Sequence, residues 1–504
     1  MKLRLTTQAG LLTASRASGQ VLNALLGIVL VRHLTQVEYG TFRQVYLLAA
    51  TMLQTELGFI ESLYFFIPSF PKLRSAFVRQ SVMVVAVMQL AGGTLLLIFK
   101  QNITHFFNNP ELATCLDLLA LYAGFSLITR IWEVELIAER RAPYAALVEG
   151  TFEALKVLLM FVALALSAGI RPLLWALVAA NGLKFFAFIL FLSREFRMFA
   201  AAGPLRQAAP QIGYAMSLWL PAMLNGAIGT QAHQYIVGHY FDPAQYAIYA
   251  VACFQVPFVG VLNNSITEVF LVRVTEYRSL GRSLELYDVW IKACRKALLL
   301  FAAIVAVVLV LAKPIIVVLF TDRYAASASL FAVMVTGLLF NSMFQDSVFR
   351  AHSAMKIYAS FYALRGLLSL VLAFIGLKFW GLWGVALSTV LSIGIVNMLQ
   401  LGPVARLLKV PFTKVLAWKD AALTLIIAAF AALATWICVH RVSSPKADLL
   451  IGMPLFGLVY GALAIRLGLV QKTEVVALTQ EIRGFFGKAV FARGNHNQLA
   501  PEGS

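Results

Sequence analysis

The chain contains few charged residues and few cysteines. Only 13% of its 504 residues are charged, whereas 61% are hydrophobic and the mean hydropathy is +0.82. Soluble domains carry about 25% charged residues, so this composition excludes a soluble globular protein. The four cysteines, Cys115, Cys253, Cys294 and Cys438, show no close spacing, and neither a disulfide framework nor a zinc site is expected. The composition is that of an integral membrane protein.

The sequence also lacks a phosphate-binding loop and any long segment between apolar runs. Gly487-Lys488-Ala489 has neither the glycine spacing nor the hydroxyl group of such a loop. ATP bound to this chain therefore cannot drive its work, and no cofactor or metal is expected. The longest external loop, about 101–112, is short. A membrane polymerase or glycan ligase would carry catalytic residues on a large external loop, so we do not expect an enzyme.

Fourteen stretches are apolar over at least the roughly 18 residues that a membrane-spanning helix requires. The expected spans are 10–34, 41–67, 80–100, 113–136, 145–168, 172–194, 210–236, 245–272, 292–320, 326–352, 360–380, 381–409, 418–440 and 449–470. With their connecting segments they occupy almost the whole chain. We therefore expect an all-α polytopic membrane protein with about 14 transmembrane helices.

Basic residues are distributed unequally between the segments that join the spans. With the N-terminus placed in the cytoplasm, 28 of the 41 lysines and arginines fall on the cytoplasmic side, nine on the opposite side and four within spans. Cationic loops resist translocation, so this bias predicts that both termini are cytoplasmic. The formal net charge of +18 is explained as a topology signal, and nucleic acid is not an expected partner.

Two segments about 206 residues apart share a pattern, which indicates an internal duplication. Val31-Arg32-His33-Leu34 and Tyr39-Gly40-Thr41-Phe42 parallel Val237-Gly238-His239-Tyr240 and Tyr246-Ala247-Ile248-Tyr249. An even number of helices in each copy gives a parallel repeat, with the substrate between the halves. We predict two pseudo-symmetric six-helix lobes followed by extra helices. The predicted divisions are an N-terminal lobe at 1–205, a C-terminal lobe at 206–410, two additional transmembrane helices at 411–470, and a cytoplasmic amphipathic segment with a disordered tail at 471–504.

The span layout, the two halves and the opening pattern around Tyr39-Gly40-Thr41-Phe42 resemble a known family. It is the polysaccharide transporter branch of the multidrug/oligosaccharidyl-lipid/polysaccharide exporter superfamily, which includes O-antigen and exopolysaccharide repeat-unit flippases. The resemblance implies two lobes that alternate between membrane faces in the bacterial inner membrane. Its implied cargo is an undecaprenyl-diphosphate-linked oligosaccharide that moves from the cytoplasmic to the periplasmic leaflet. The implied partners are this lipid-linked cargo, the bilayer and other polysaccharide assembly proteins.

Four basic residues lie inside predicted spans, all in the first half: Arg16, Arg130, Lys156 and Lys184. A cation near the bilayer centre costs a few kcal/mol unless it faces a polar cavity or a partner. These residues are therefore candidates for binding an anionic substrate, and a guanidinium can grip a phosphate with two parallel hydrogen bonds. For Arg16, snorkelling of the side chain to the inner interface is an equally good explanation.

Acidic residues in the same helices are candidates for ion coupling. Glu149, Glu153 and Lys156 share one helix face at spacings of four and three residues. A Glu153–Lys156 ion pair is the structural interpretation, and a carboxylate that titrates or binds Na⁺ is the functional one. Glu61 and Glu268, related by the duplication, are further coupling candidates near the inner interface.

Polar residues in the second half offer a different chemistry. Asp346 and Arg365 lie near predicted cytoplasmic ends of spans. The side chains that could hydrogen-bond sugar hydroxyls, or equally cross-link the bundle, are Asn225, Gln231, His233, Asn263, Asn264 and Gln345. Drug or cation antiport is the alternative function, but it would favour an acidic pocket in the first lobe, whereas the first predicted span carries Arg16 and no carboxylate.

The charge bias gives a test of topology. Single cysteines introduced at Thr35, Tyr240 and Pro445 should react with an impermeant thiol reagent added from the periplasm, whereas a cysteine at Val490 should not. Periplasmic labelling at Val490 would contradict both the orientation and the even number of spans.

Overall fold

A computed structural model describes residues 5–54, 57–166, 169–196, 209–223, 229–255, 259–440 and 444–470, and these segments are almost entirely helical. The first bundle consists of α1 Leu5–His33, α2 Gln36–Gln54, α3 Leu57–Ser69, α4 Arg74–Ile98, α5 Lys100–Phe106, α6 Leu116–Ala138, α7 Ala142–Leu166 and α8 Ile170–Phe196, with short 3-10 turns η1 Pro71–Leu73 and η2 Pro110–Thr114. After α9 Ala209–Met223, the second bundle consists of α10 Ala232–Tyr240, α11 Pro243–Ala252, α12 Val259–Ser279, α13 Ser283–Phe320, η5 Asp322–Tyr324, α14 Ser327–Thr336, η6 Gly337–Ser342, α15 Gln345–Ala351 and α16 Met355–Leu407. The chain continues through η7 Phe412–Lys414 into α17 Trp418–Val439 and α18 Pro445–Arg466.

Each of the 14 expected spans falls on a helix, on two consecutive helices, or on one arm of α16. Eight described segments are by themselves long and apolar enough to cross a membrane. They are Leu12–His33, Pro71–Ile98, Ile170–Glu195, Ser283–Phe320, Ser327–Ala351, Met355–Leu407, Trp418–Val439 and Pro445–Arg466. Large apolar side chains such as Leu90 and Leu450 are more than two-thirds exposed, as expected for surfaces that contact lipid. The protein is an all-α multi-pass membrane protein, as predicted.

An ion network fixes one end of the first bundle. The Arg74 guanidinium at the start of α4 pairs with the fully buried Glu135 of α6, and lies 3.4 Å from Glu139 and 3.6 Å from Glu195 of α8. Arg141 also pairs with Glu195 at 3.3 Å. A buried carboxylate is stable only with such partners, so the network holds α4, α6 and α8 in register at the predicted cytoplasmic end.

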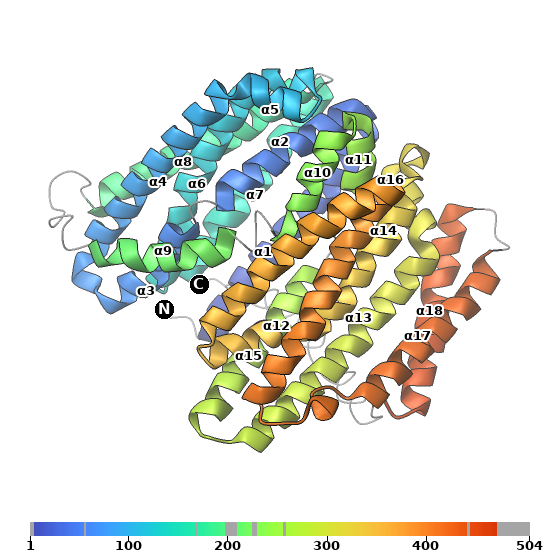
Figure 1. The fold of residues 1–504 in the computed structure, drawn as a ribbon. Coiled ribbons are helices and arrows are strands. Elements are labelled where there is room, and N and C mark those ends of the chain that lie inside the picture. Colours follow the sequence, from blue (N-terminus) through green and yellow to red (C-terminus); the bar gives the residue numbers. More distant parts are fainter. Residues whose placement is uncertain are drawn as a thin grey trace, which may run out of the picture.

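The second bundle is closed by a helical hairpin within α16. Gly381 has φ 56° and ψ −134°, values that favour glycine, and the helix reverses direction there. The two arms then touch backbone to backbone, because a Cβ atom at Gly384 would lie 1.9 Å from the Gly376 carbonyl oxygen. Helices α17 and α18 pack on α13 and form the edge layer beside this bundle (Figure 1).

Helix α9 belongs by contact to the first bundle, although the predicted lobe division precedes it. It packs on α3, where the buried Gln211 side chain donates to Ser62 of α3 and Ser81 of α4, each at 2.8 Å. Helix α10 instead packs on α16 in the second bundle. The division at 205/206 lies outside the described residues and stays a prediction, as does the segment 471–504.

The two bundles join where α2 lies beside α11 (Figure 1). Gly40 makes this contact possible, because a Cβ atom there would lie 1.8 Å from the Pro243 carbonyl oxygen. Arg32, at the end of α1, donates to the carbonyl groups of Val318 and Leu319, the latter at 3.1 Å. These carbonyls form the negative end of α13, which attracts a cation.

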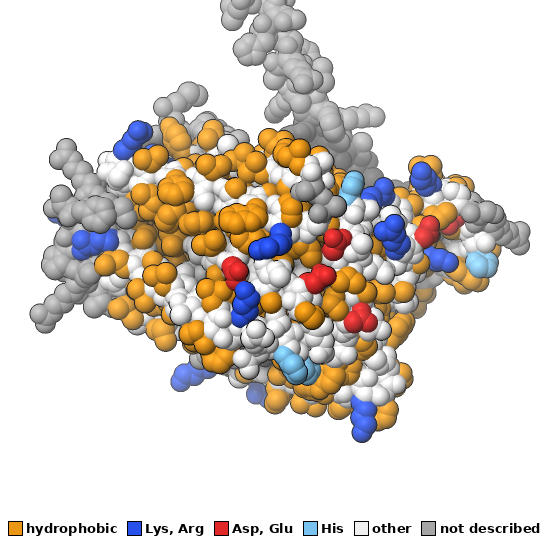
Figure 2. Space-filling view, turned by 90° about the horizontal axis from the view of Figure 1, so that it is seen from above, with side chains coloured by type: hydrophobic (Ala, Val, Ile, Leu, Met, Phe, Trp, Pro, Cys, Tyr) orange, Lys and Arg blue, Asp and Glu red, His pale blue; other side chains and the backbone are white. Residues whose placement is uncertain are grey.

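Further hydrogen bonds reinforce the same end of the molecule, the predicted periplasmic one. Gln36 donates to the Arg323 carbonyl at 2.7 Å, and Asn108 donates to the His239 carbonyl at 2.7 Å. Seen from this end, the described surface carries acidic and basic side chains interspersed with hydrophobic ones (Figure 2). These hydrogen bonds add to an apolar contact, because Phe42 of α2 and Tyr246 and Tyr249 of α11 are buried in one hydrophobic core that spans both bundles.

The duplicated sequence pattern corresponds to two similar helix–turn–helix units, α1–α2 and α10–α11. The second helix of each unit begins with a side-chain cap. Thr35 and Glu38 form a capping box, with a 2.9 Å bond from the Thr35 amide to Glu38 and a 3.2 Å bond from the Glu38 amide to Thr35. Asp242 caps α11 through the Gln245 amide at 2.8 Å. These caps fix where the helices that meet at the junction begin.

Candidate functional site

The four bases expected inside spans lie on four helices of the first bundle: Arg16 on α1, Arg130 on α6, Lys156 on α7 and Lys184 on α8. Three of them are ion-paired with carboxylates of the same bundle. The bundle interior is therefore a nearly balanced array of charges and not the purely cationic lining that the four bases alone suggested.

Both lysines are held by acids of α7. Lys184 Nζ lies 2.6 Å from Glu149 Oε1, and Lys156 Nζ lies 2.5 Å from Glu153 Oε1, one turn away on the same helix. Asn23 of α1 also donates to Glu153. All four charged side chains are mostly buried, so each charge is stabilised by its ion-pair partner where little water can reach it.

Small residues allow α1 to approach α7 and so position these groups. A Cβ atom at Gly19 would lie 3.3 Å from the Glu153 Cγ atom, and one at Gly150 would lie 3.2 Å from the Ser15 hydroxyl. Ser15 donates to the Ala146 carbonyl at 2.8 Å across the same contact. Sequence patterns for charge do not show this packing, because it depends on residues with almost no side chain.

The two arginines lie in a more open environment. Arg16 Nη2 is 2.8 Å from Glu133 Oε1 of α6, yet the Arg16 side chain is about half exposed. Arg130 is exposed and, within the described part of the chain, has no ion pair. The Tyr64 hydroxyl of α3 lies within electrostatic range of both arginines, and Glu61 of the same helix also acts on it. These groups form one cluster, in which neither Arg130 nor Glu61 has an ion pair among the described residues.

A third arginine, Arg43 of α2, lines a cavity of about 440 Å³ at the bundle interface. Its Nε atom is buried without a hydrogen-bond partner. Gln20 and Asn23 of α1 contribute from the first bundle, and Gln234 of α10 contributes from the second. Within the described segments Arg43 has no ion pair, so its charge faces the cavity.

Arg43 was one of the nine bases assigned to the periplasmic side, although it lies two residues inside the predicted span 41–67. The structure begins α2 at Gln36, so Arg43 lies about two turns inside the helix. The capping box formed by Thr35 and Glu38 was the signal that could have shown this helix start.

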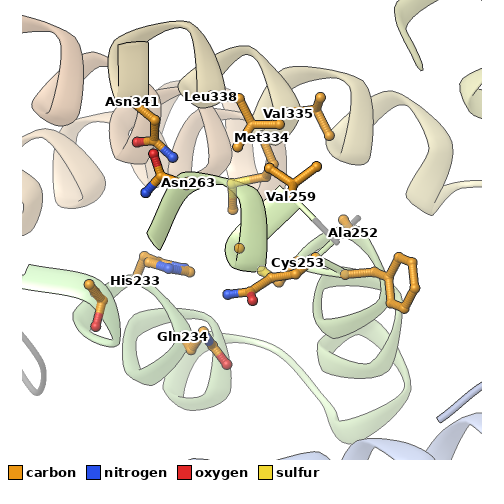
Figure 3. A pocket seen from close by; sticks show the side chains of 14 residues that line it. His233, Gln234, Ala252, Cys253, Val259, Asn263, Met334, Val335, Leu338 and Asn341 are labelled. Carbon is orange, nitrogen blue, oxygen red and sulfur yellow. The ribbon is translucent and has the colours of Figure 1, made fainter. Parts of the chain in front are cut away.

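A second cavity of about 320 Å³ adjoins the first and shares Gln234, Cys253 and Gly260 with it. Asn263 and Asn341 lie at one side of this cavity, and His233 and Gln234 lie at the other (Figure 3). A third cavity, of about 390 Å³, shares Asn263 and Asn341 with the second and extends into the second bundle. The three cavities thus adjoin one another in series, from Arg43 at the bundle interface to the interior of the second bundle.

The polar candidates of the second half divide into two groups. Gln231 accepts from Thr51 of α2 at 2.8 Å, and His233 bonds to the Tyr249 hydroxyl at 2.9 Å, so both cross-link helices. Asn225 lies outside the described residues. The other predicted candidates line the third cavity: Asn263, Asn264, Gln345, Asp346 and Arg365.

The remaining coupling candidates differ in what the structure shows. Glu61 is exposed and makes no ion pair in the described segments. The backbone of Glu268 lies in α12, but its side chain is outside what the structure describes. Nowhere in the described chain do three or more histidine, cysteine, aspartate or glutamate side chains gather as metal ligands would.

The fold of this chain is similar to the folds of several solved membrane transporters. A lipid II flippase, MurJ, in an inward closed conformation has the same fold, with a TM-score of 0.70, 15% identity, and coverage of 91% of this chain and 99% of that one. An inward-facing multidrug resistance transporter of the MATE family has a TM-score of 0.62, 16% identity, and coverage of 78% and 95%. An outward-facing MATE transporter has a TM-score of 0.53, 15% identity, and coverage of 79% and 94%. No curated protein matches the sequence.

The fold and the cavities at the bundle interface define a multi-pass membrane protein with the architecture of lipid flippases and multidrug transporters. The profile described as "Polysaccharide biosynthesis protein" matches residues 29–329, which is more than half of the chain. The chain belongs to this polysaccharide biosynthesis protein family.

The Glu153–Lys156 pair gives a test that separates structure from transport. Glu153→Gln alone should lower protein abundance, because breaking one side of a buried pair costs about 3–5 kcal/mol. The double variant Glu153→Gln with Lys156→Gln should recover abundance in membrane immunoblots and retain surface polysaccharide. Glu61→Gln, at an exposed side chain, is the matched control for abundance. Recovered abundance without export in the double variant would show that the pair acts in transport.

Proposed function

We propose that this protein moves an undecaprenyl-diphosphate-linked oligosaccharide from the cytoplasmic to the periplasmic leaflet of the bacterial inner membrane. The observation that carries the proposal is the path of polar cavities between the bundles, with the unpaired Arg43 at the interface. Membership in the polysaccharide biosynthesis protein family supports a polysaccharide precursor as cargo. The fold shared with a lipid II flippase supports movement of a lipid-linked molecule.

Unpaired arginines account for an anionic cargo. Arg130 and Arg43 have no ion pair among the described residues. The Arg43 guanidinium is partly buried, and a desolvated cation without a partner costs several kcal/mol. A diphosphate offers each guanidinium a charge and several acceptor oxygens in a bidentate geometry. Arg16 can also bind the diphosphate, because its side chain is about half exposed and Glu133 contacts only the Nη2 atom of its guanidinium. In our proposal Lys156 serves the site indirectly by holding Glu153 in place, and Glu149 holds Lys184 until that carboxylate is protonated.

The structure supports an inward-facing state for this transport cycle. The bundles are joined by Arg32, Gln36 and Asn108 at the end that the charge bias assigns to the periplasm. The higher TM-score to the inward-facing MATE transporter than to the outward-facing one agrees with this arrangement. In our proposal the cargo headgroup enters from the cytoplasmic side, and the junction opens after the headgroup has bound.

Glu149 is the proposed coupling residue. It shares one buried site with Lys184, and it lies within electrostatic range of Glu133 and Glu153. Protonation of Glu149 would release Lys184 to the cargo, and deprotonation would recapture it, which links an ion gradient to the cycle. Glu61 and Glu268 remain alternative coupling residues near the inner interface.

Cation or drug antiport is the second candidate, favoured by the three carboxylates in the interior of the first bundle. These carboxylates, Glu133, Glu149 and Glu153, are each paired with a base of the same bundle. A cationic drug would have to displace those bases, whereas an anionic cargo can use the arginines that have no ion pair. The geometry therefore favours the lipid-linked oligosaccharide.

Removal of the arginines tests the cargo charge. Arg16→Ala and Arg130→Ala should each abolish or strongly reduce surface polysaccharide in a complemented deletion strain at normal protein abundance. Loss of one charged hydrogen bond is worth about 1.5–3 kcal/mol, or roughly ten- to a hundredfold in affinity. Binding of undecaprenyl diphosphate to the purified variants, measured by titration, should fall by the same factor.

Arg273→Ala serves as the control, because Arg273 is an exposed residue in a loose 3.8 Å pair with Glu276. It should leave both export and binding unchanged. Full complementation by both Arg16→Ala and Arg130→Ala would mean that these arginines do not bind the cargo.

A further inference from the structure

The third cavity, inside the second bundle, is lined by an unusual number of carboxamide side chains. It measures about 390 Å³, within the range of small-molecule binding sites. Its six carboxamides come from α12, η6, α15 and α16: Asn263, Asn264, Asn341, Gln345, Asn397 and Gln400. Each carboxamide presents donors and an acceptor in one plane, a pattern that matches neighbouring hydroxyl groups on a sugar ring.

Three buried polar atoms in this cavity have no hydrogen-bond partner among the residues that the structure describes. They are Asn263 Oδ1, Ser347 Oγ and Arg365 Nε. Buried polar atoms are nearly always hydrogen-bonded in folded proteins, so three such atoms around one cavity indicate a ligand-binding surface. Asn263 offers an acceptor, Arg365 a donor, and Ser347 either. A hydroxyl group, which both donates and accepts, satisfies all three.

The charges in the cavity favour an uncharged ligand. Asp346 accepts a hydrogen bond from Tyr362, and Arg365 lies within electrostatic range of both groups. One acid and one base therefore offset each other, in contrast to the unpaired Arg43 at the far end of the path. The ring of Phe361 also lines the cavity. The negative face of an aromatic ring attracts the weakly positive C–H groups of a sugar.

Two of these carboxamides connect the cavity to the rest of the path. Asn263 and Asn341 line both this cavity and the one shown in Figure 3. That neighbouring cavity continues to the one lined by Arg43. A molecule with an anionic group and a chain of sugars can therefore place the anion in the arginine region and the sugars in the second bundle at the same time.

We propose that this carboxamide cavity is the binding site for the neutral, polyhydroxylated glycan part of the cargo, an inference that rests on the proposed function. Recognition is then divided: the arginines of the first bundle bind the diphosphate that all such cargoes share, and the second bundle reads the sugars. Selectivity between glycans is set by Asn263, Asn264 and Arg365, whose side chains line the cavity.

Titration of the purified full-length protein with two separate probes tests the division. One probe is the repeat-unit oligosaccharide released from the producing cell's own surface polysaccharide, which carries no lipid or phosphate. The other is undecaprenyl diphosphate without sugar. Asn263→Leu and Arg365→Gln should each weaken oligosaccharide binding at least about tenfold, the loss expected when a site is left with buried polar groups unpaired. Both variants should bind undecaprenyl diphosphate normally.

Asn181→Leu is the matched control, because Asn181 is a carboxamide on a spanning helix that bonds only to its own backbone, at 2.9 Å to the Leu177 carbonyl. It should change neither titration. If Asn263→Leu does not fold, as judged by its melting temperature, Asn264→Leu replaces it, because the Asn264 side chain is exposed and its loss does not disturb packing. Unchanged oligosaccharide binding in these variants, or an equal loss for both probes, would overturn the glycan site.

The wild-type protein distinguishes this proposal from the proposed function. Binding of the oligosaccharide but not of undecaprenyl diphosphate would support the glycan site and contradict a lipid-linked cargo. Binding of undecaprenyl diphosphate alone would overturn the glycan site and leave the flippase proposal standing. Binding of neither probe would overturn both.

Discussion

The cost of placing charge inside an apolar bundle is the constraint on which the rest of this structure depends. A charged side chain within a membrane helix must find a partner or face a polar space. The first bundle meets this condition with the Lys184–Glu149 and Lys156–Glu153 pairs, both mostly buried. Arg43 meets it differently, because its guanidinium faces a cavity at the bundle interface. Pairing therefore links the helices of the first bundle, and in our proposal the arginines without an ion pair among the described residues bind the anion.

The same constraint shapes the junction between the bundles. Arg32 binds the carbonyl end of α13 and Gln36 binds a backbone carbonyl, and water can replace these polar contacts when the junction opens. Gly40 brings the α2 backbone against Pro243, and buried side chains of α2 and α11 share one hydrophobic core there. Opening of the junction therefore has to expose or repack apolar side chains as well as replace polar contacts.

Much of the fold was predictable from local sequence, but the site was predictable only in part. Apolar runs predicted where the helices lie, because hydropathy is a property of consecutive residues, and eight described segments are long and apolar enough to cross a membrane. The Glu153–Lys156 pair followed from helical spacing, whereas the Lys184–Glu149 and Arg16–Glu133 pairs join different helices and required the packing. Arg43 was not predicted as a candidate, because the cavity that it lines combines α1, α2, α10 and α11. The carboxamide cavity combines α12, η6, α15 and α16, and no local pattern brings these together.

The central claim is that separation of the bundles carries a lipid-linked oligosaccharide across the membrane. The most direct measurement uses the protein in vesicles, with its own cysteines replaced and new cysteines at Gln36 and Arg323. The Gln36 side chain donates to the Arg323 carbonyl across the junction, so the two positions are close. A short, reducible bis-methanethiosulfonate cross-linker should stop transfer of fluorescent undecaprenyl-diphosphate oligosaccharide between leaflets, and reduction should restore it. Binding of the cargo should persist in the cross-linked state. Transfer at the same rate with the junction locked would contradict the account.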